Sequence, residues 1–121
     1  MKKILILLFV FTSTLAFSQN KNAKATIEVD GVCGMCKERI EKASIKTKGV
    51  KSAVWNVKTH KLKLIYNEAK TDLATIKKNI AAVGHDSKDV KASKEAYATV
   101  HGCCKYRDED VRKAHKNDND K

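Results

Sequence analysis

The 121-residue chain contains no proline, one tryptophan and only four cysteines. It has no glycine-rich phosphate loop and no combination of a nucleophile with a general base, so the sequence argues against an enzyme. Its basic residues occur singly and not in a block with interleaved aromatics, which argues against a nucleic-acid-binding protein. The one uncharged apolar run, residues 4–16, is shorter than the roughly 20 residues that span a bilayer.

The first 18 residues predict an export signal. Lys2 and Lys3 form a basic start, the apolar run follows, and Ala16 and Ser18 place small residues at the two positions that a signal peptidase reads. We predict cleavage after Ser18, a periplasmic or secreted protein, and no stable membrane insertion after cleavage. A retained N-terminal anchor is the alternative.

The partner that the net positive charge suggests depends on whether the protein is exported. The chain has 25 Lys and Arg residues against 14 Asp and Glu, a formal net charge of +11. Such an excess suggests nucleic acid or a membrane surface as a partner. Because an exported chain rarely meets nucleic acid, we interpret the charge as a solvated basic surface. Attraction to anionic components of the cell envelope is the alternative.

The alternation of apolar residues predicts a small α+β domain. The expected elements, in order, are a strand over 25–30, a helix from Lys37 that Gly49 ends, strands over 50–57 and 61–67, a helix that Thr71 or Asp72 caps and Gly84 ends, and a weak strand over 86–92. The core residues that this pattern predicts are Trp55, Tyr66, Leu73, Ile76 and Ile80. This β-α-β-β-α-β order is that of a ferredoxin-like sandwich.

The remaining segments flank this domain. Residues 19–24 are polar and predict a flexible N-terminus. Residues 93–106 form a short C-terminal extension, with a short helix capped by Ser93. Residues 107–121 are charged and lack periodic apolar residues, so we predict a disordered tail.

Two of the cysteines lie in the loop before the first predicted helix, in the sequence Gly31-Val32-Cys33-Gly34-Met35-Cys36. Thiols at this spacing close on one soft ion or on each other, and a helix N-terminus lowers the thiol pKa. Thiolates suit Cu(I) and Hg(II), and also Zn(II). Two ligands leave an open site that is suited to passing a metal on, whereas a structural zinc site needs four.

With this loop, the strand before it, the hairpin over 50–66 and the helix that ends at Gly84, residues 25–92 resemble the heavy-metal-associated domain. That family includes copper chaperones, periplasmic mercury-binding proteins and the N-termini of metal pumps. The resemblance implies that Cys33 and Cys36 bind the metal. An aromatic residue often follows the glycine after the second helix in the family, and here that position holds His85.

The loop departs from the family pattern G-M-x-C-x-x-C. Only Val32 separates Gly31 from Cys33, and Met35 lies between the cysteines instead of before them. The metal preference of ordinary copper chaperones therefore does not transfer directly. We expect Met35 to be buried as a cap on the core, with a weak thioether ligand as the alternative.

A second pair, Cys103 and Cys104, follows the expected end of the domain. Adjacent cysteines rarely arise for packing in a chain with only four. If the extension folds back, Cys103, Cys104 and His101 would join Cys33, Cys36 and His85, which lies beside the loop, as candidate metal ligands. A site with three or four thiolates would hold Zn(II) or a Cu(I) cluster more tightly. His60 and His115 are expected at the surface.

The sequence thus predicts an exported protein that captures or transfers a soft metal, with Cu(I) favoured and Hg(II) or Zn(II) as alternatives. Its expected partners are the ion and a membrane metal transporter or another metal-binding protein.

Two other functions use the same cysteines. A disulfide within the loop, or two that join the loop to Cys103 and Cys104, would give a stapled envelope interaction domain. The other alternative is a thiol–disulfide redox protein using Cys33 and Cys36. Against it, the chain has no tryptophan before the motif and no proline, so the thioredoxin-like pattern is missing.

Overall fold

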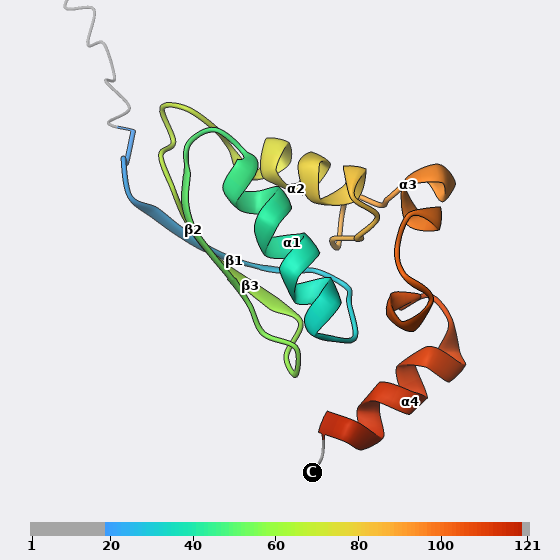
Figure 1. Cartoon of the computed structure of the whole chain (residues 1–121). Coiled ribbons are helices and arrows are strands. Elements are labelled where there is room, and N and C mark those ends of the chain that lie inside the picture. The colour runs from blue at the N-terminus through green and yellow to red at the C-terminus, as the bar shows by residue number, and fades with distance from the viewer. Residues whose placement is uncertain (1–18, 120–121) are drawn as a thin grey trace, which may run out of the picture.

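A computed structural model of the chain describes residues 19–119. The predicted signal peptide, residues 1–18, lies outside the described residues. Three antiparallel strands form one sheet in the order β1-β3-β2, with β1 over Ala23–Glu28, β2 over Val50–Trp55 and β3 over Lys61–Tyr66. Helices α1 (Gly34–Lys46) and α2 (Leu73–Ala82) pack on one face of it (Figure 1). The α+β ferredoxin-like class is confirmed.

The core lies between the sheet and the two helices. Alternate residues of β3, Leu62, Leu64 and Tyr66, are buried, whereas Lys61 and Lys63 face solvent. The predicted core residues Trp55, Tyr66, Ile76 and Ile80 are buried, and Leu73 packs partly buried against them. Burial of one face in each element is what specifies the register of the sheet.

The predicted strand over 86–92 does not form among residues 19–119; one isolated bridge, between Val29 and Ser87, stands in its place. The reason is local hydrogen bonding. The Asp86 carboxylate accepts from the Ala92 N–H at 2.7 Å, and the Ser87 N–H donates to the Val90 carbonyl at 2.9 Å. The segment therefore closes on itself, and these backbone groups are not available for a ladder.

Some element boundaries also differ from the prediction. β1 begins at Ala23, so the last two residues of the predicted flexible N-terminus belong to the sheet. Helix α1 begins at Gly34 with Cys33 as its N-cap. Asp72 caps α2 by accepting from the Thr75 N–H at 2.7 Å. The predicted short helix is confirmed as α3, Lys94–Ala98, and Ser93 caps it.

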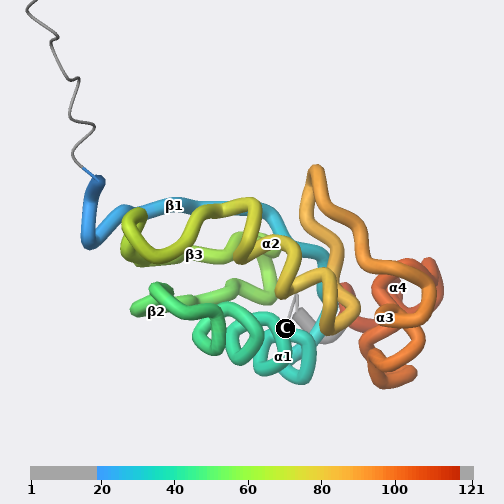
Figure 2. Tube along the Cα trace, turned by 90° about the horizontal axis from the view of Figure 1, so that it is seen from above, coloured from blue at the N-terminus to red at the C-terminus, as the bar shows by residue number. Residues whose placement is uncertain are grey.

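Residues 102–119 contain two further helical elements, which corrects the prediction of a disordered tail for the part of it that the structure describes. A 3-10 turn, η1 (Gly102–Cys104), leads to helix α4 (Glu109–Asn119). Acidic residues in its first turn suit the helix dipole, and Glu109 pairs with Lys113 at 3.0 Å. In both views the extension gathers at the end of the domain where α1 begins (Figures 1 and 2).

Gly84 allows the extension to pack closely against the end of α2. Its φ is +97°, and a Cβ there would lie 2.5 Å from Val100 Cγ2 and 2.7 Å from the Ala96 carbonyl oxygen. Only glycine combines that backbone conformation with so close an approach.

In the part of the chain that the structure describes, no helix has the length and apolar character needed to cross a bilayer.

Candidate metal centre

The two loop cysteines lie at the N-terminus of α1. Cys33 is the N-cap residue, Cys36 lies in the first turn, and their Sγ atoms are 3.6 Å apart. A Cβ on Gly31 would lie 3.0 Å from both Cys36 Cβ and the Trp55 ring, so the loop passes directly over the core. Cys36 is fully buried, whereas Cys33 is half-buried.

Two ring nitrogens hold the backbone that leads into this loop. Trp55 Nε1 donates to the Val29 carbonyl at 3.0 Å, and His85 Nδ1 lies 2.8 Å from the Asp30 carbonyl. Since a carbonyl only accepts, His85 carries its proton on Nδ1. These contacts hold the backbone carbonyls of Val29 and Asp30, just before the loop, and they do not involve its thiols.

The extension brings the second cysteine pair to the first. The sulfur atoms of Cys33, Cys103 and Cys104 all lie within 4.8 Å of one another, although 70 residues of sequence separate Cys33 from Cys103. The Cys103 and Cys104 sulfurs are 3.9 Å apart, and all four cysteines are free thiols. The structure therefore brings the second pair to Cys33; Cys36 is not one of these three, although its Sγ is 3.6 Å from that of Cys33.

A buried polar contact anchors the extension beside the thiols. The Tyr106 hydroxyl donates to the Gly84 carbonyl at 2.6 Å and accepts from the Asp86 N–H at 2.9 Å. Arg107 forms a bidentate pair with the Asp86 carboxylate, at 2.7 and 3.1 Å, and donates to the Ala92 carbonyl at 2.8 Å. Bidentate geometry makes this ion pair stronger than an ordinary surface pair.

Aromatic packing completes the anchor. The Tyr106 ring stacks on His85 at a centroid distance of 5.4 Å and meets Tyr97 edge-on at 5.2 Å. The Arg107 guanidinium covers the other ring, with its Cζ 4.3 Å from the Tyr97 centroid. These contacts are the edge-to-face and cation–π arrangements that aromatic side chains favour.

The thiols differ in acidity. Burial raises the pKa of Cys33, but the Cys104 and Cys36 thiols and the backbone N–H groups of Cys36 and Met35 outweigh it, so the net pKa is lowered. Burial dominates at Cys36 and Cys104 and raises the pKa of both thiols. Cys33 is therefore the first of these three to ionise as a metal approaches.

The two predicted histidine ligands lie outside the thiol group. His85 is fully buried, and burial lowers its pKa; its Nε2 has no hydrogen-bond partner. His101 is exposed and lines a surface hollow together with Arg39 and Lys42. Among residues 19–119, neither belongs to the group of candidate ligands whose atoms lie within 4.8 Å of one another.

Met35 is exposed, not buried as predicted. Its side chain is 42% exposed, and the Cys103 thiol donates to its sulfur at 3.6 Å. His115 also has a contact that the sequence did not indicate, because its Nε2 donates to the Cys103 carbonyl at 2.8 Å. No local signal marks either contact: Met35 and Cys103 are 68 residues apart, and Cys103 and His115 are 12 residues apart on separate elements.

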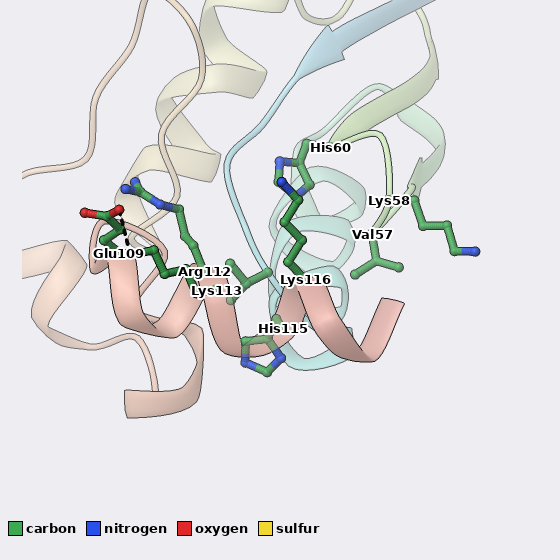
Figure 3. A pocket seen from close by; sticks show the side chains of 9 residues that line it. Val57, Lys58, His60, Glu109, Arg112, Lys113, His115 and Lys116 are labelled. Atoms are coloured by element: carbon green, nitrogen blue, oxygen red, sulfur yellow. Dashed lines mark ion pairs between the residues drawn. The ribbon is translucent and has the colours of Figure 1, made fainter. Parts of the chain in front are cut away.

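A groove of about 600 Å³ lies between α4 and the turn after β2, beside the cysteine loop (Figure 3). It is lined by Val32, Val57, Lys58, His60, Glu109, Arg112, Lys113, His115 and Lys116. Glu109, its only acidic residue, is paired with Lys113. The groove therefore carries net positive charge beside Val32 of the cysteine loop.

Curated proteins match part of this chain. The copper-exporting P-type ATPase of Staphylococcus haemolyticus is 38% identical over 77 residues, which are 63% of this chain and 10% of that protein. The chain thus spans about a tenth of the length of the curated relatives it matches.

Two solved structures resemble the domain. The CopZ metallochaperone is 29% identical, with a TM-score of 0.52 and coverage of 54% of this chain and 98% of its own. The water-soluble region of the P-type ATPase CopA from Bacillus subtilis is 31% identical, with a TM-score of 0.51 and coverage of 55% and 44%.

The fold and the thiols at the start of α1 define a ferredoxin-like domain with a soft-ligand cluster at its loop–helix junction. Residues 26–86 match the heavy-metal-associated domain. The chain belongs to this family. The extension that carries Cys103 and Cys104 lies beyond the matched residues.

Proposed function

We propose that this protein is an exported carrier of a soft metal ion, with Cu(I) favoured, that captures the ion through Cys33 and Cys36 together with Cys103 and Cys104. The observation that carries the proposal is the meeting of three sulfur atoms within 4.8 Å, from two separate segments. The names of the relatives, a copper-exporting ATPase and a metallochaperone, support copper as the cargo.

The donor set suits a soft ion. It consists of thiols without a carboxylate, and thiolate ligands select Cu(I), Zn(II) and similar ions over Mg(II) or Ca(II). Hg(II) and Zn(II) remain the alternatives to Cu(I). Cys33 supplies the first thiolate, and the buried thiols of Cys36 and Cys104 release their protons as sulfur–metal bonds replace them.

Transfer follows from the unequal exposure of the ligands. An incoming thiolate from a partner reaches the half-buried Cys33 more easily than the fully buried Cys36 and Cys104. One ligand is then exchanged at a time, so the ion is never released into water. The proposed partner is a membrane metal transporter or another metal-binding protein, and residues 1–18 support an exported location.

The test uses the chain from Gln19 to Lys121, reduced and free of metal. Binding of Cu(I), Hg(II) and Zn(II) is measured by native mass spectrometry and competition titration. We expect tight binding of a soft ion that Cys33→Ser/Cys36→Ser abolishes. An affinity equal to that of the double variant would refute the carrier function.

A second double variant tests the extension. We expect Cys103→Ser/Cys104→Ser to weaken binding by at least about tenfold, because removing even a group that supports a metal ligand costs that much. His101→Ala is the matched control: it lies in the same segment but outside the thiol group, and should bind as the wild type does. Unchanged affinity and stoichiometry in the cysteine variant would remove the pair from the site.

Thiol–disulfide exchange is the second candidate function. The lowered pKa of Cys33 and the 3.6 Å separation from Cys36 Sγ would also serve a redox protein. Insulin reduction separates the two functions. Turnover that depends on Cys36 would favour the redox role, and absence of turnover together with metal binding would favour the carrier.

A further inference from the structure

Two exposed sulfur atoms from different segments meet at the edge of the thiol cluster. Met35 lies in the first turn of α1, and Cys103 lies in η1 of the extension. The Cys103 thiol donates to the Met35 thioether at 3.6 Å, and both side chains are exposed. Met35 is not part of the buried core.

The sulfur atoms become less accessible from this pair inward. Cys103 is exposed, Cys33 is half-buried, and Cys36 and Cys104 are fully buried. Neighbouring sulfurs are close: Cys103 to Cys104 is 3.9 Å, and Cys33 to Cys36 is 3.6 Å. An ion bound at Cys103 therefore has the next ligands within a few ångströms and does not need to cross water.

The chemistry of the pair restricts which ion it accepts. A thioether is a neutral, soft donor that binds Cu(I), whereas Zn(II) prefers thiolate, imidazole and carboxylate ligands. A thioether also keeps its ion weakly, which suits a step that must be followed by transfer to thiolates. Cys33, Cys36 and Cys104 offer only thiol ligands. The Met35 thioether is therefore the group beside them that favours Cu(I) over Zn(II).

We propose that Met35 and Cys103 form a receiving site, at which a soft monovalent ion of the Cu(I) class exchanges its first ligand before it reaches the buried thiols. In this step a Cys103 sulfur–metal bond forms, one bond between the metal and its donor breaks, and the thiol proton passes to solvent. The Met35 sulfur holds the ion while the second donor bond breaks. No electron is transferred. The inference rests on the proposed carrier function.

The test compares rates of loading with affinities at equilibrium. The chain from Gln19 is mixed with the Cu(I) complex of bathocuproine disulfonate, and the loss of the coloured complex is followed by stopped-flow absorbance. We expect Met35→Leu, which keeps the apolar volume and removes the sulfur, to slow uptake by about tenfold. Affinity at equilibrium should change by no more than about twofold, as for an ordinary surface substitution.

Two controls separate the receiving role from general damage. Ile45→Leu alters an equally exposed apolar residue of the same helix and should load at the wild-type rate. Zn(II) loading, followed with a chromophoric zinc chelator, should be the same in Met35→Leu and the wild type. Cys103→Ser should slow Cu(I) uptake at least as much as Met35→Leu does.

The outcomes distinguish this inference from the carrier function. Wild-type loading rates in Met35→Leu, with binding still abolished by Cys33→Ser/Cys36→Ser, would overturn the inference and leave the carrier function standing. Equal slowing of Cu(I) and Zn(II) would also overturn it. If the wild type takes up no soft ion, both the carrier function and the receiving site are refuted.

A measurement without metal gives an independent check. In the metal-free protein, alkylation by iodoacetamide followed by mass spectrometry should modify the exposed Cys103 and the half-buried Cys33 before the buried Cys36 and Cys104. Modification of Cys104 ahead of Cys103 would overturn the order of access on which the receiving site depends.

Discussion

Replacement of Tyr106 by phenylalanine would remove one oxygen atom from the contact that anchors the extension. Tyr106 is 4% exposed, and its hydroxyl is hydrogen-bonded to both the Gly84 carbonyl and the Asp86 N–H. Phenylalanine fills the same space but leaves these two backbone groups buried without a partner. Each unsatisfied group costs about 1–3 kcal/mol, and partial relaxation leaves an expected loss of about 2–4 kcal/mol.

This loss of stability weakens the docking of the extension against the domain. It therefore also affects the thiol cluster, which contains two cysteines of the extension. Tyr106 lies two residues after Cys104, which is fully buried when the extension is docked. A loss of about 2 kcal/mol raises the undocked fraction by roughly thirtyfold, and Cys104 reacts with alkylating reagents from that state. We therefore expect faster alkylation of Cys104 in Tyr106→Phe, with much less change at Cys36.

The assay for stability is urea unfolding of the reduced chain, followed by the fluorescence of Trp55, the only tryptophan, which is 1% exposed. Tyr97→Phe is the matched control. Its hydroxyl accepts one exposed hydrogen bond from the Arg107 N–H at 3.1 Å, so its loss should cost no more than about 1 kcal/mol. A Tyr106→Phe variant within about 0.5 kcal/mol of the wild type, with unchanged alkylation of Cys104, would refute the anchor.

Two further changes test the same junction. Burial raises the pKa of the Asp86 carboxyl, but Arg107 and the Ala92 N–H outweigh it, so the pKa is lowered on folding. The stabilisation is therefore complete above the unfolded value of about 3.9 and is lost as the pH falls through the lower folded pKa. Urea midpoints between pH 6 and pH 3 should fall less steeply in Asp86→Asn than in the wild type; equal slopes would contradict the ion pair. Gly84→Ala should cost at least about 2 kcal/mol in the same unfolding assay, since Ala at positive φ is strained and its Cβ would overlap Val100. A stability equal to that of the wild type would contradict the close approach of the extension.

Most elements of the fold could be predicted from local sequence patterns. Alternation marked β3, helical spacing marked α2, and short-range capping marked Asp72 and Ser93, because each signal depends on residues within one or two turns. The prediction failed at residues 86–92 and at α4. In the first case side chains competed for the backbone hydrogen bonds, and in the second a charged segment gained a contact to the extension through His115.

The candidate site could likewise be predicted only in part. The spacing of Cys33 and Cys36 before a helix was sufficient, from sequence alone, to predict a soft-metal loop, because the helix N-terminus acts on its immediate neighbours. The contact of Met35 with Cys103 and the burial of His85 were not predictable, since both depend on the path of the extension. Its path is set by Tyr106 and other residues whose partners lie far away in the sequence.

The sequence by itself therefore determined a small α+β domain with one pair of cysteines placed for a soft ion. Only the tertiary structure decided that Cys103 and Cys104 return to that pair and that Met35 meets them at the surface. The physical reason is that hydrogen bonds, stacking and an ion pair at Gly84, His85 and Asp86 hold the extension against the domain. Such contacts join groups that no local pattern connects.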